Sequence, residues 1–582
     1  MKKTMRFLCM ATLVVMGAIF AGCARFDENL QKDNCNGAVT LTLCFSDEEG
    51  TKALTAAGVK TFAPDDQIAV VYEDEYDKTR KVLSSALVAE DIHNEGKNAN
   101  FTVNFSEGTP KNNGKVRYIY PANMARVTIS DDVSVDDDTF TINFDKLNTQ
   151  DGSLTTLGNS LDLCTFDGNF SASGELPASA TLTNQLAILA LTLKDGKGTV
   201  ATTDDEDITS GITNVTVTDG TYNYTVNRLA GAGPIFVAIR PTNTAIIDVT
   251  ATNGTKLYFK SLTGKTYAKS NGYNVSWLMT DMLAIPLTMK AVSPGEIEIQ
   301  SPKIGMKYKK NNDAIVTIDS DANVYIDVDF GDRVAFYGNG TSITSYQFTK
   351  ITGGTSLVDV YGNIMSLVNE EGFATATGLT SSNAFNELFK GNLNLCDASG
   401  LQLPATTLTT SCYESLFEGC TSLTAAPKLP ATILAEDCYS SMFAGCTSLS
   451  IAPSLPAETL AEGCYSGMFV DCTYLTSVPT TLPATILQEY CYLQMFSGCI
   501  SLTVAPTLPA PDLVIGCYVE MFYECESLES VTCLATATSD DYTSEWLKYV
   551  AVSGTFTTPS TTVWEYPSEN GIPDGWTRVN SD

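Results

Sequence analysis

Cysteine is the residue type with the clearest chemical pattern in this 582-residue chain. The motif Cys-Tyr-x-x-(Met/Leu)-Phe-x-x-Cys occurs five times, and its leading cysteines are 26, 26, 27 and 26 residues apart. The ten cysteines of these motifs are Cys412, Cys420, Cys438, Cys446, Cys464, Cys472, Cys491, Cys499, Cys517 and Cys525. A fixed repeat of this length predicts a solenoid of stacked units, so we assign these cysteines a structural role.

Thiols also form disulfides and bind metals, and the spacing of the cysteines limits both possibilities. The two cysteines of one repeat are eight residues apart, which is roughly 12 Å along a continuous helix and too far for a disulfide. Bonds between neighbouring repeats stay open, although buried thiols that fill a small apolar space are the interpretation we favour. No Cys-x-x-Cys pair or histidine lies nearby, so we expect no metal and no cofactor.

Catalytic chemistry has little support in the sequence. His93 is the single histidine, so any triad, Cys-His pair or histidine zinc site would have to use it. It lies in the polar segment 90–96, which we expect to be a surface turn. Acidic clusters at 131–132, 136–138 and 204–207 lack the spacing of a calcium loop, so solvated loops are favoured. Glycoside hydrolysis needs only two carboxylates and stays open. We expect a protein that is not an enzyme and has no catalytic residues.

Cys23 is the residue to which we assign a covalent modification. Three basic residues precede an apolar run at 7–19, and small residues stand directly before Cys23. This pattern is typical of a bacterial lipoprotein: a signal peptide at 1–22, lipid on the thiol, and a polar tether at 23–36. An ordinary signal peptide or an anchor helix is the alternative, but the run is short for a span. We expect attachment to the outer membrane of a Gram-negative cell, with the body facing outward.

Composition limits the kinds of partner. The formal net charge is -32, and 44% of the residues are hydrophobic. That apolar content excludes a mostly disordered chain. The acidic field repels phosphates, which argues against nucleic acid, so we expect no nucleic-acid partner.

Strand patterns predict the elements of the first half. Alternation of Val39, Leu41, Leu43 and Phe45 with polar residues predicts a half-buried strand. Similar segments separated by turn-rich stretches predict an antiparallel β-sandwich over 37–280. After a break come further strand patterns, which predict a small β domain at 287–362. We expect it to cap the apolar end of the solenoid.

The repeats predict an α/β solenoid over 363–535, with a C-terminal cap at 536–582. Apolar side chains of one repeat stand at i, i+3, i+4 and i+7, namely Tyr439, Met442, Phe443 and Cys446. This spacing predicts a short helix, and Gly445 suits its end, where a positive φ is often required. Alternation from Leu449 to Leu455 then predicts a short strand.

Soft motifs in the first half resemble a known family. Residues 61–68, 118–122 and 271–275 are similar to the fimbrillin-like domains of surface lipoproteins and pilins from anaerobic Gram-negative bacteria. The resemblance implies a pair of transthyretin-like sandwiches. Family pilins that polymerise lose their first strand after an arginine, which opens a groove for a donor strand. No arginine lies between Arg25 and Arg80.

The repeats resemble a second family, the BspA-like leucine-rich repeat surface proteins. The segments that carry the resemblance are 442–449, the Leu-Pro-Ala sequences at 429–431, 455–457 and 482–484, and the ending 571–577. The resemblance implies a cell-surface protein that adheres to host matrix or to other bacteria, with no catalytic residues to transfer.

These features together predict a surface-exposed lipoprotein that binds and does not catalyse. The membrane is one partner, through lipidated Cys23; the other is an unnamed host or bacterial surface protein or glycan, held by the solenoid. Candidate positions on its binding face vary between repeats: Lys428, Ser454, Thr480, Thr507, Glu414, Ser440, Ser466, Leu493 and Val519. A merely solvated polar surface is the alternative for any one of them. A second hypothesis is an accessory or tip component of a fimbrillin-type pilus, with pilus subunits as partners.

Overall fold

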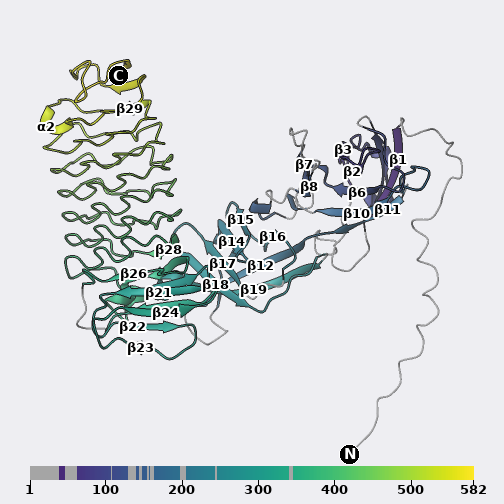
Figure 1. The fold of residues 1–582 in the computed structure, drawn as a ribbon, viewed down its shortest axis with the longest axis horizontal. Helices are drawn as coiled ribbons and strands as arrows, with labels where there is room; N and C mark the ends of the chain where they lie inside the picture. The colour runs from purple at the N-terminus through teal and green to yellow at the C-terminus, as the bar shows by residue number, and fades with distance from the viewer. Residues whose placement is uncertain are drawn as a thin grey trace, which may run out of the picture. The chain divides into compact units, whose positions relative to one another are not determined.

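A computed structural model of the chain (Figure 1) describes residues 38–45, 62–105, 108–128, 139–142, 147–153, 156–157, 163–177, 179–196, 205–242, 246–269, 271–339 and 345–581. Cys23, with the predicted signal peptide and tether, lies outside these residues. The chain divides into two compact units, Met1–Met279 and Thr280–Asp582. Each unit is described by itself.

The first sheet of unit 1 has eight strands in the order β3-β2-β6-β10-β11-β1-β5-β4. Their bounds are β1 (Ala38–Phe45), β2 (Ala69–Glu73), β3 (Thr79–Leu83), β4 (Ile92–His93), β5 (Asn98–Asn104), β6 (Lys115–Tyr120), β10 (Cys164–Asn169) and β11 (Ser179–Asn184). The strand predicted from Leu41 and Leu43 is confirmed, and both side chains are buried. It lies antiparallel to β5 and parallel to β11.

A nine-stranded sheet follows, in the order β13-β12-β19-β18-β17-β14-β15-β9, with β16 paired to β12. Its strands are β9 (Thr149–Gln150), β12 (Ala187–Asp195), β13 (Glu206–Asp207), β14 (Asn214–Thr218), β15 (Asn223–Asn227), β16 (Ile235–Ile239), β17 (Ile246–Thr252), β18 (Leu257–Thr263) and β19 (Asn271–Asp281). β7 (Ala125–Thr128) and β8 (Thr139–Ile142) form a separate pair. Ala69, Val71 and Ile119 of the first sheet belong to the same core as the second sheet, so part of the outer face of the first sheet is covered.

Unit 2 begins with two antiparallel sheets, of orders β23-β22-β25-β20-β27-β28 and β24-β21-β26. The strands are β20 (Thr288–Ala291), β21 (Gly295–Gln300), β22 (Lys307–Lys310), β23 (Val316–Thr317), β24 (Val324–Val328), β25 (Arg333–Tyr337), β26 (Lys350–Thr352), β27 (Val358–Asn363) and β28 (Leu395–Gln402). Within these two sheets β27 and β28 are the one parallel pair of strands among the described residues. β28 precedes the repeats directly, and one continuous hydrophobic core runs from these sheets into them.

Helices are short throughout the described residues. The 3₁₀ helices are η2 (Ala89–Asp91), η3 (Asn94–Gly96), η4 (Ala122–Met124), η7 (Thr209–Gly211), η8 (Met282–Ala284), η9 (Ile364–Leu367) and η10 (Phe373–Thr375). The α-helix within residues 345–581 is α2 (Asp540–Thr543), which follows the repeats. Three parallel strands, β29 (Ser530–Thr532), β30 (Gly554–Thr558) and β31 (Trp576–Asn580), complete the unit.

Each repeat is one coil of a stack, and its backbone N–H groups alternate between two kinds of partner (Figure 1). The N–H of Leu416 donates to the carbonyl of Tyr413 in the same coil, at 3.2 Å. The next N–H, of Phe417, donates to the carbonyl of Met442 in the following coil, at 2.9 Å. Neighbouring coils are therefore joined by backbone hydrogen bonds along their whole turn-forming segment.

The predicted α/β solenoid is wrong. The segments expected to be helices are successions of turns, because every fourth residue has a left-handed φ, as at Ser411 (52°), Ser415 (54°) and Gly419 (72°). Such a chain cannot form i to i−4 hydrogen bonds, so half of its N–H groups bond to the next coil instead. The strands expected in the repeats are reduced to isolated bridges, such as Ile451 to Ser477.

Candidate functional site

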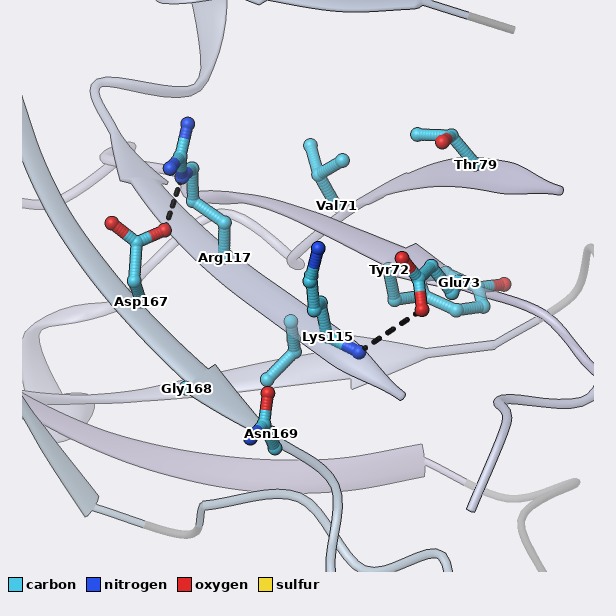
Figure 2. Close-up of a pocket in the computed structure, with 10 residues that line it drawn as sticks. Val71, Tyr72, Glu73, Thr79, Lys115, Arg117, Asp167, Gly168 and Asn169 are labelled. Carbon is cyan, nitrogen blue, oxygen red and sulfur yellow. Dashed lines mark hydrogen bonds and ion pairs between the residues drawn. The ribbon is translucent and has the colours of Figure 1, made fainter. Parts of the chain in front are cut away.

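An open groove of about 570 Å³ lies on the outer face of the first sheet of unit 1, over β2, β3, β6 and β10 (Figure 2). Arg117 forms an ion pair with Asp167 across β6 and β10. The backbone N–H of Lys115 donates to the carboxylate of Glu73 at 3.4 Å. Val71 stands opposite Arg117 on the neighbouring strand β2 and lines the same groove. Exposed cross-strand ion pairs are typical of a solvated sheet surface, so we assign no reaction to this groove.

The second cysteine of each repeat has a defined hydrogen-bond partner. Cys446 donates from its Sγ to the carbonyl of Phe417 in the preceding coil, at 3.1 Å. The four equivalent bonds join Cys420 to Phe389, Cys472 to Phe443, Cys499 to Phe469 and Cys525 to Phe496. Each of these carbonyls also accepts from a backbone N–H, as that of Phe417 does from Cys420 at 3.0 Å, so the thiol is its second donor.

Burial also controls the acidity of these thiols. It raises the pKa of Cys420, Cys472 and Cys525 to about 12, because the apolar interior disfavours the thiolate. A thiol with so high a pKa is a poor nucleophile and a poor metal ligand at neutral pH. The chemistry of the second cysteines is thus hydrogen bonding and packing.

The first cysteines of the repeats lie in the same interior. All ten repeat cysteines are buried, and none is in a disulfide. Burial likewise raises the pKa of Cys412 and Cys517 to about 11. Beside them stands a column of tyrosines, in which Tyr413 and Tyr439 stack with ring centroids 5.7 Å apart.

The predicted binding face is only partly at the surface. Lys428, Ser454 and Thr480 are exposed, and Thr507 is half-buried. The other five predicted positions are all half-buried: Glu414, Ser440, Ser466, Leu493 and Val519. Equivalent positions recur at each coil, so these side chains form rows along the stack.

Sequence reasoning missed apolar residues that the coils leave exposed. Ile451 is 62% exposed and Val504 is 57% exposed, with Ser477 at the equivalent position of the coil between them. Ile433 and Ile486 form a second such pair around Thr459. The signal was present in the sequence, because Ile or Val stands where other repeats carry Thr, Ser or Ala.

The remaining candidate residues are dispersed. His93 is exposed in β4, which pairs with β5, rather than in the predicted turn, and its Nε2 lies 3.1 Å from Asn100 Nδ2. Residues 131–138 lie outside the described part, and the predicted Glu206 and Asp207 are exposed in β13. No group of three or more His, Cys, Asp or Glu side chains suited to a metal occurs in the described residues. Within the same residues, no helix has the length and apolar character to cross a bilayer.

Comparisons with known proteins were made for the chain. It is similar to a fimbrial assembly protein of Parabacteroides distasonis, at 13% identity over 42% of this chain and 91% of that protein, with a TM-score of 0.24. A candidate cell adhesion protein of Bacteroides uniformis is similar at 13% identity, over 42% of this chain and 97% of that protein, with a TM-score of 0.23. No protein-family model and no curated protein matches.

These similar structures are fimbrial and adhesion proteins of Bacteroidetes, and none of them extends the resemblance to leucine-rich repeats. TM-scores this low carry no argument about function. The function therefore has to be argued from the residues of this chain.

Proposed function

We propose that the chain is a lipid-anchored protein of the outer cell surface that binds a macromolecular partner and has no catalytic role. One observation carries the proposal: consecutive coils hold equivalent exposed side chains in rows. The coils are spaced closely, since stacked rings in adjacent coils have centroids 5.4 to 6.1 Å apart. Such a regular, extended surface suits contact with a large partner, as in other repeat proteins.

Exposed apolar side chains strengthen this proposal. Ile451 and Val504 protrude from alternate coils, and Ile433 and Ile486 do the same in the second row. Apolar side chains in water cost free energy that a partner recovers by covering them. The polar residues around them, such as Ser477 and Thr459, suit the hydrated rim of an interface.

The anchor and the charge define the setting of the proposal. Cys23 is the lipid attachment point, which would hold the body at the outer membrane with the coils facing outward. The net charge of -32 favours a neutral or basic partner, such as a protein or glycan of a host or bacterial surface.

The first sheet favours the adhesin over the pilus hypothesis. β1 already lies between β5 and β11: it pairs with β5 from Ala38 to Cys44 and with β11 from Thr42 to Phe45. A donor strand from another subunit would have to displace it. A role as an accessory or tip subunit of a pilus is therefore the weaker proposal.

Protease treatment of intact cells tests the location. We expect external protease to release fragments of the coil region, while Cys23 stays with the membrane and takes up radiolabelled lipid. The variant Cys23→Ser should lose both the label and the membrane fraction. Protection of the whole chain in intact cells, with digestion after lysis, would exclude a surface role.

Substitutions on the coils test the binding role. The double variant Ile451→Ser, Val504→Ser should reduce binding of the full chain to immobilised host matrix proteins or bacterial cells about tenfold or more, as for interface anchors. Leu229→Ser is the matched control, because Leu229 is 91% exposed in unit 1. Equal binding by all three proteins would remove the coil face from the proposal.

A further inference from the structure

A cavity of about 390 Å³ that is open to solvent lies at the last coil of unit 2. One wall is the segment from Leu547 to Val552, and the other includes Pro567, Ser568, Glu569, Pro573 and Asp574. Tyr549 stands in the first wall with 57% of its surface exposed. The cavity thus combines an exposed aromatic ring with two carboxylates.

The second wall is held by close backbone packing of the segment 571–577, Gly-Ile-Pro-Asp-Gly-Trp-Thr. A Cβ at Gly571 would lie 2.3 Å from the carbonyl oxygen of Glu565, and one at Gly575 would lie 2.3 Å from that of Val552. Only glycine permits these approaches. Trp576 donates from Nε1 to the carbonyl of Ala551 at 2.8 Å, which ties the second wall to the first.

This bracing fixes the position of Asp574, which lies between the two pinned residues Gly571 and Gly575 and is exposed. Among residues 345–581, no described side chain pairs with its carboxylate. On the same wall Glu569 contacts Lys548, with 3.5 Å between Oε2 and Nζ. The segment therefore presents a carboxylate with free acceptor atoms toward the cavity.

Tyr549 has a left-handed backbone conformation at a position where the fold does not require a tyrosine. Its φ is +62°, and the equivalent positions of other coils, which also have positive φ, hold Gly391, Gly419, Gly445, Asp471, Gly498 and Glu524. The position therefore accepts several residue types, and the aromatic ring is particular to this coil.

The ring is also held in place. Tyr523 contacts it edge to face, with centroids 5.4 Å apart and planes 78° apart. The ammonium of Lys548 lies 5.3 Å from the ring centroid. Lys548 is in turn paired with Glu545 at 3.0 Å. The ring is thus oriented before any ligand arrives, which lowers the entropy cost of binding.

We propose that this cavity binds a saccharide, with the Tyr549 ring against the C–H face of a pyranose and the Asp574 carboxylate accepting hydrogen bonds from its hydroxyls. Sugars have both an apolar face and many donors, and an oriented ring beside a free carboxylate satisfies both. An apolar ligand would instead leave the Asp574 carboxylate desolvated without a partner. This inference rests on the proposed binding function and names its ligand class.

The test uses the full chain and an array of immobilised neutral and amino-sugar oligosaccharides, with each positive titrated by calorimetry. Tyr549→Gly should lower the affinity about tenfold or more. It should not unfold the coil, because glycine already occupies the equivalent position in other coils. Asp574→Asn, which keeps the shape of the side chain, should weaken binding through loss of a charged acceptor. Tyr474→Ser is the control, since Tyr474 is exposed on another coil.

The outcomes separate this inference from the adhesin proposal. Sugar binding that both cavity variants lose and the control keeps supports the saccharide site. Absence of sugar binding, or sugar binding unchanged in both variants, overturns the site. If the chain then still binds cells through Ile451 and Val504, the adhesin proposal stands without it. If the chain binds neither cells nor sugars, both fail.

Discussion

The two units achieve burial by different routes. In unit 1, Cys44 of β1 lies beside Thr181 of β11, 137 residues later. In unit 2, a coil contacts the next coil about 26 residues on, as in the hydrogen bond from Gln494 to Glu520. Aromatic pairs differ in the same way: Phe62 meets Phe101 at 76°, whereas Phe443 and Phe469 are within 3° of parallel.

The difference teaches that repetition makes like residues meet like residues. A coil related to its neighbour by translation places each side chain over its own equivalent, so rings must stack in columns. A sandwich brings together unrelated segments, so its rings adopt edge-to-face contacts. Stability in the coils should therefore be a sum of nearest-neighbour contacts, whereas the sandwich should unfold as a whole.

Alkaline pH should produce the largest difference in stability between the two units. Burial raises the pKa of Cys420, Cys472 and Cys491 to about 12, against about 8.5 in an unfolded chain. Folded thiols hold their protons more tightly, so their contribution is complete below about pH 8.5 and is lost as pH rises toward 12. In that window each thiol lowers the free energy of unfolding by about 1 kcal/mol per pH unit. We expect unit 2 to unfold before unit 1, as measured by hydrogen exchange of their separate peptides.

Neutral pH, where both units should be protected, is the control for that titration. Simultaneous loss of both units, or earlier loss of unit 1, would contradict the role assigned to the buried thiols.

Removal of one ring from the stacked phenylalanines of the coils should lower the free energy of unfolding of the coils by about 3 to 5 kcal/mol. Phe443 is fully buried and stacks with Phe417 and Phe469. In Phe443→Ala, faster hydrogen exchange should be greatest in the adjacent coils and decline with distance along the stack. Phe101→Ala in unit 1 is the counterpart, and it should speed exchange across the whole first sheet. A uniform effect in both units would refute the nearest-neighbour description.

Asp74 offers the matching test on the acid side of unit 1. Its buried carboxylate accepts from the N–H groups of Tyr76 and Lys78, both at 2.9 Å, and from Arg80 Nε at 2.8 Å. Burial acts to raise its pKa, but these hydrogen bonds outweigh burial and lower it. The contribution is therefore present above about pH 4 and is lost as pH falls.

Asp74→Ala leaves these donors unpaired and should destabilise unit 1 by about 3 kcal/mol, as measured by chemical denaturation. At acid pH the stability of unit 1 in this variant, its acid limb, should then depend less on pH than in the parent chain. An unchanged acid limb would show that Asp74 does not control it.

The smallest expected effect concerns the left-handed positions. Gly445→Ala should cost about 1 kcal/mol, because alanine is strained at a φ of 71°. Its Cβ would meet the Cα of Gly419 at an ordinary 3.5 Å, so strain acts alone. Asp471→Gly, at the equivalent position of the next coil, should stabilise by a similar amount. Thermal unfolding of both variants tests this: the midpoint temperature should fall in Gly445→Ala and rise in Asp471→Gly. Shifts of the same sign would contradict the argument.

Many of the buried side chains could be predicted from the sequence. The Tyr, Met, Phe and Cys side chains of the repeats are buried, and the φ of Gly445 is positive, although it stands in a turn and not at the end of a helix. The strand at Leu41 and Leu43 is confirmed as well. These features depend on which side of the backbone a residue faces, and local periodicity records that directly.

Tertiary structure alone decided the form of the coil. Spacing of i, i+3, i+4 and i+7 fits a helix, but it also fits four-residue turns that return side chains to the same side. Which occurs depends on whether a neighbouring coil supplies carbonyls such as that of Met442. Periodicity records the side a residue faces and not the partner of its N–H, so the turns, and the approach of Asp574 to Tyr549 across one cavity, had to come from the fold.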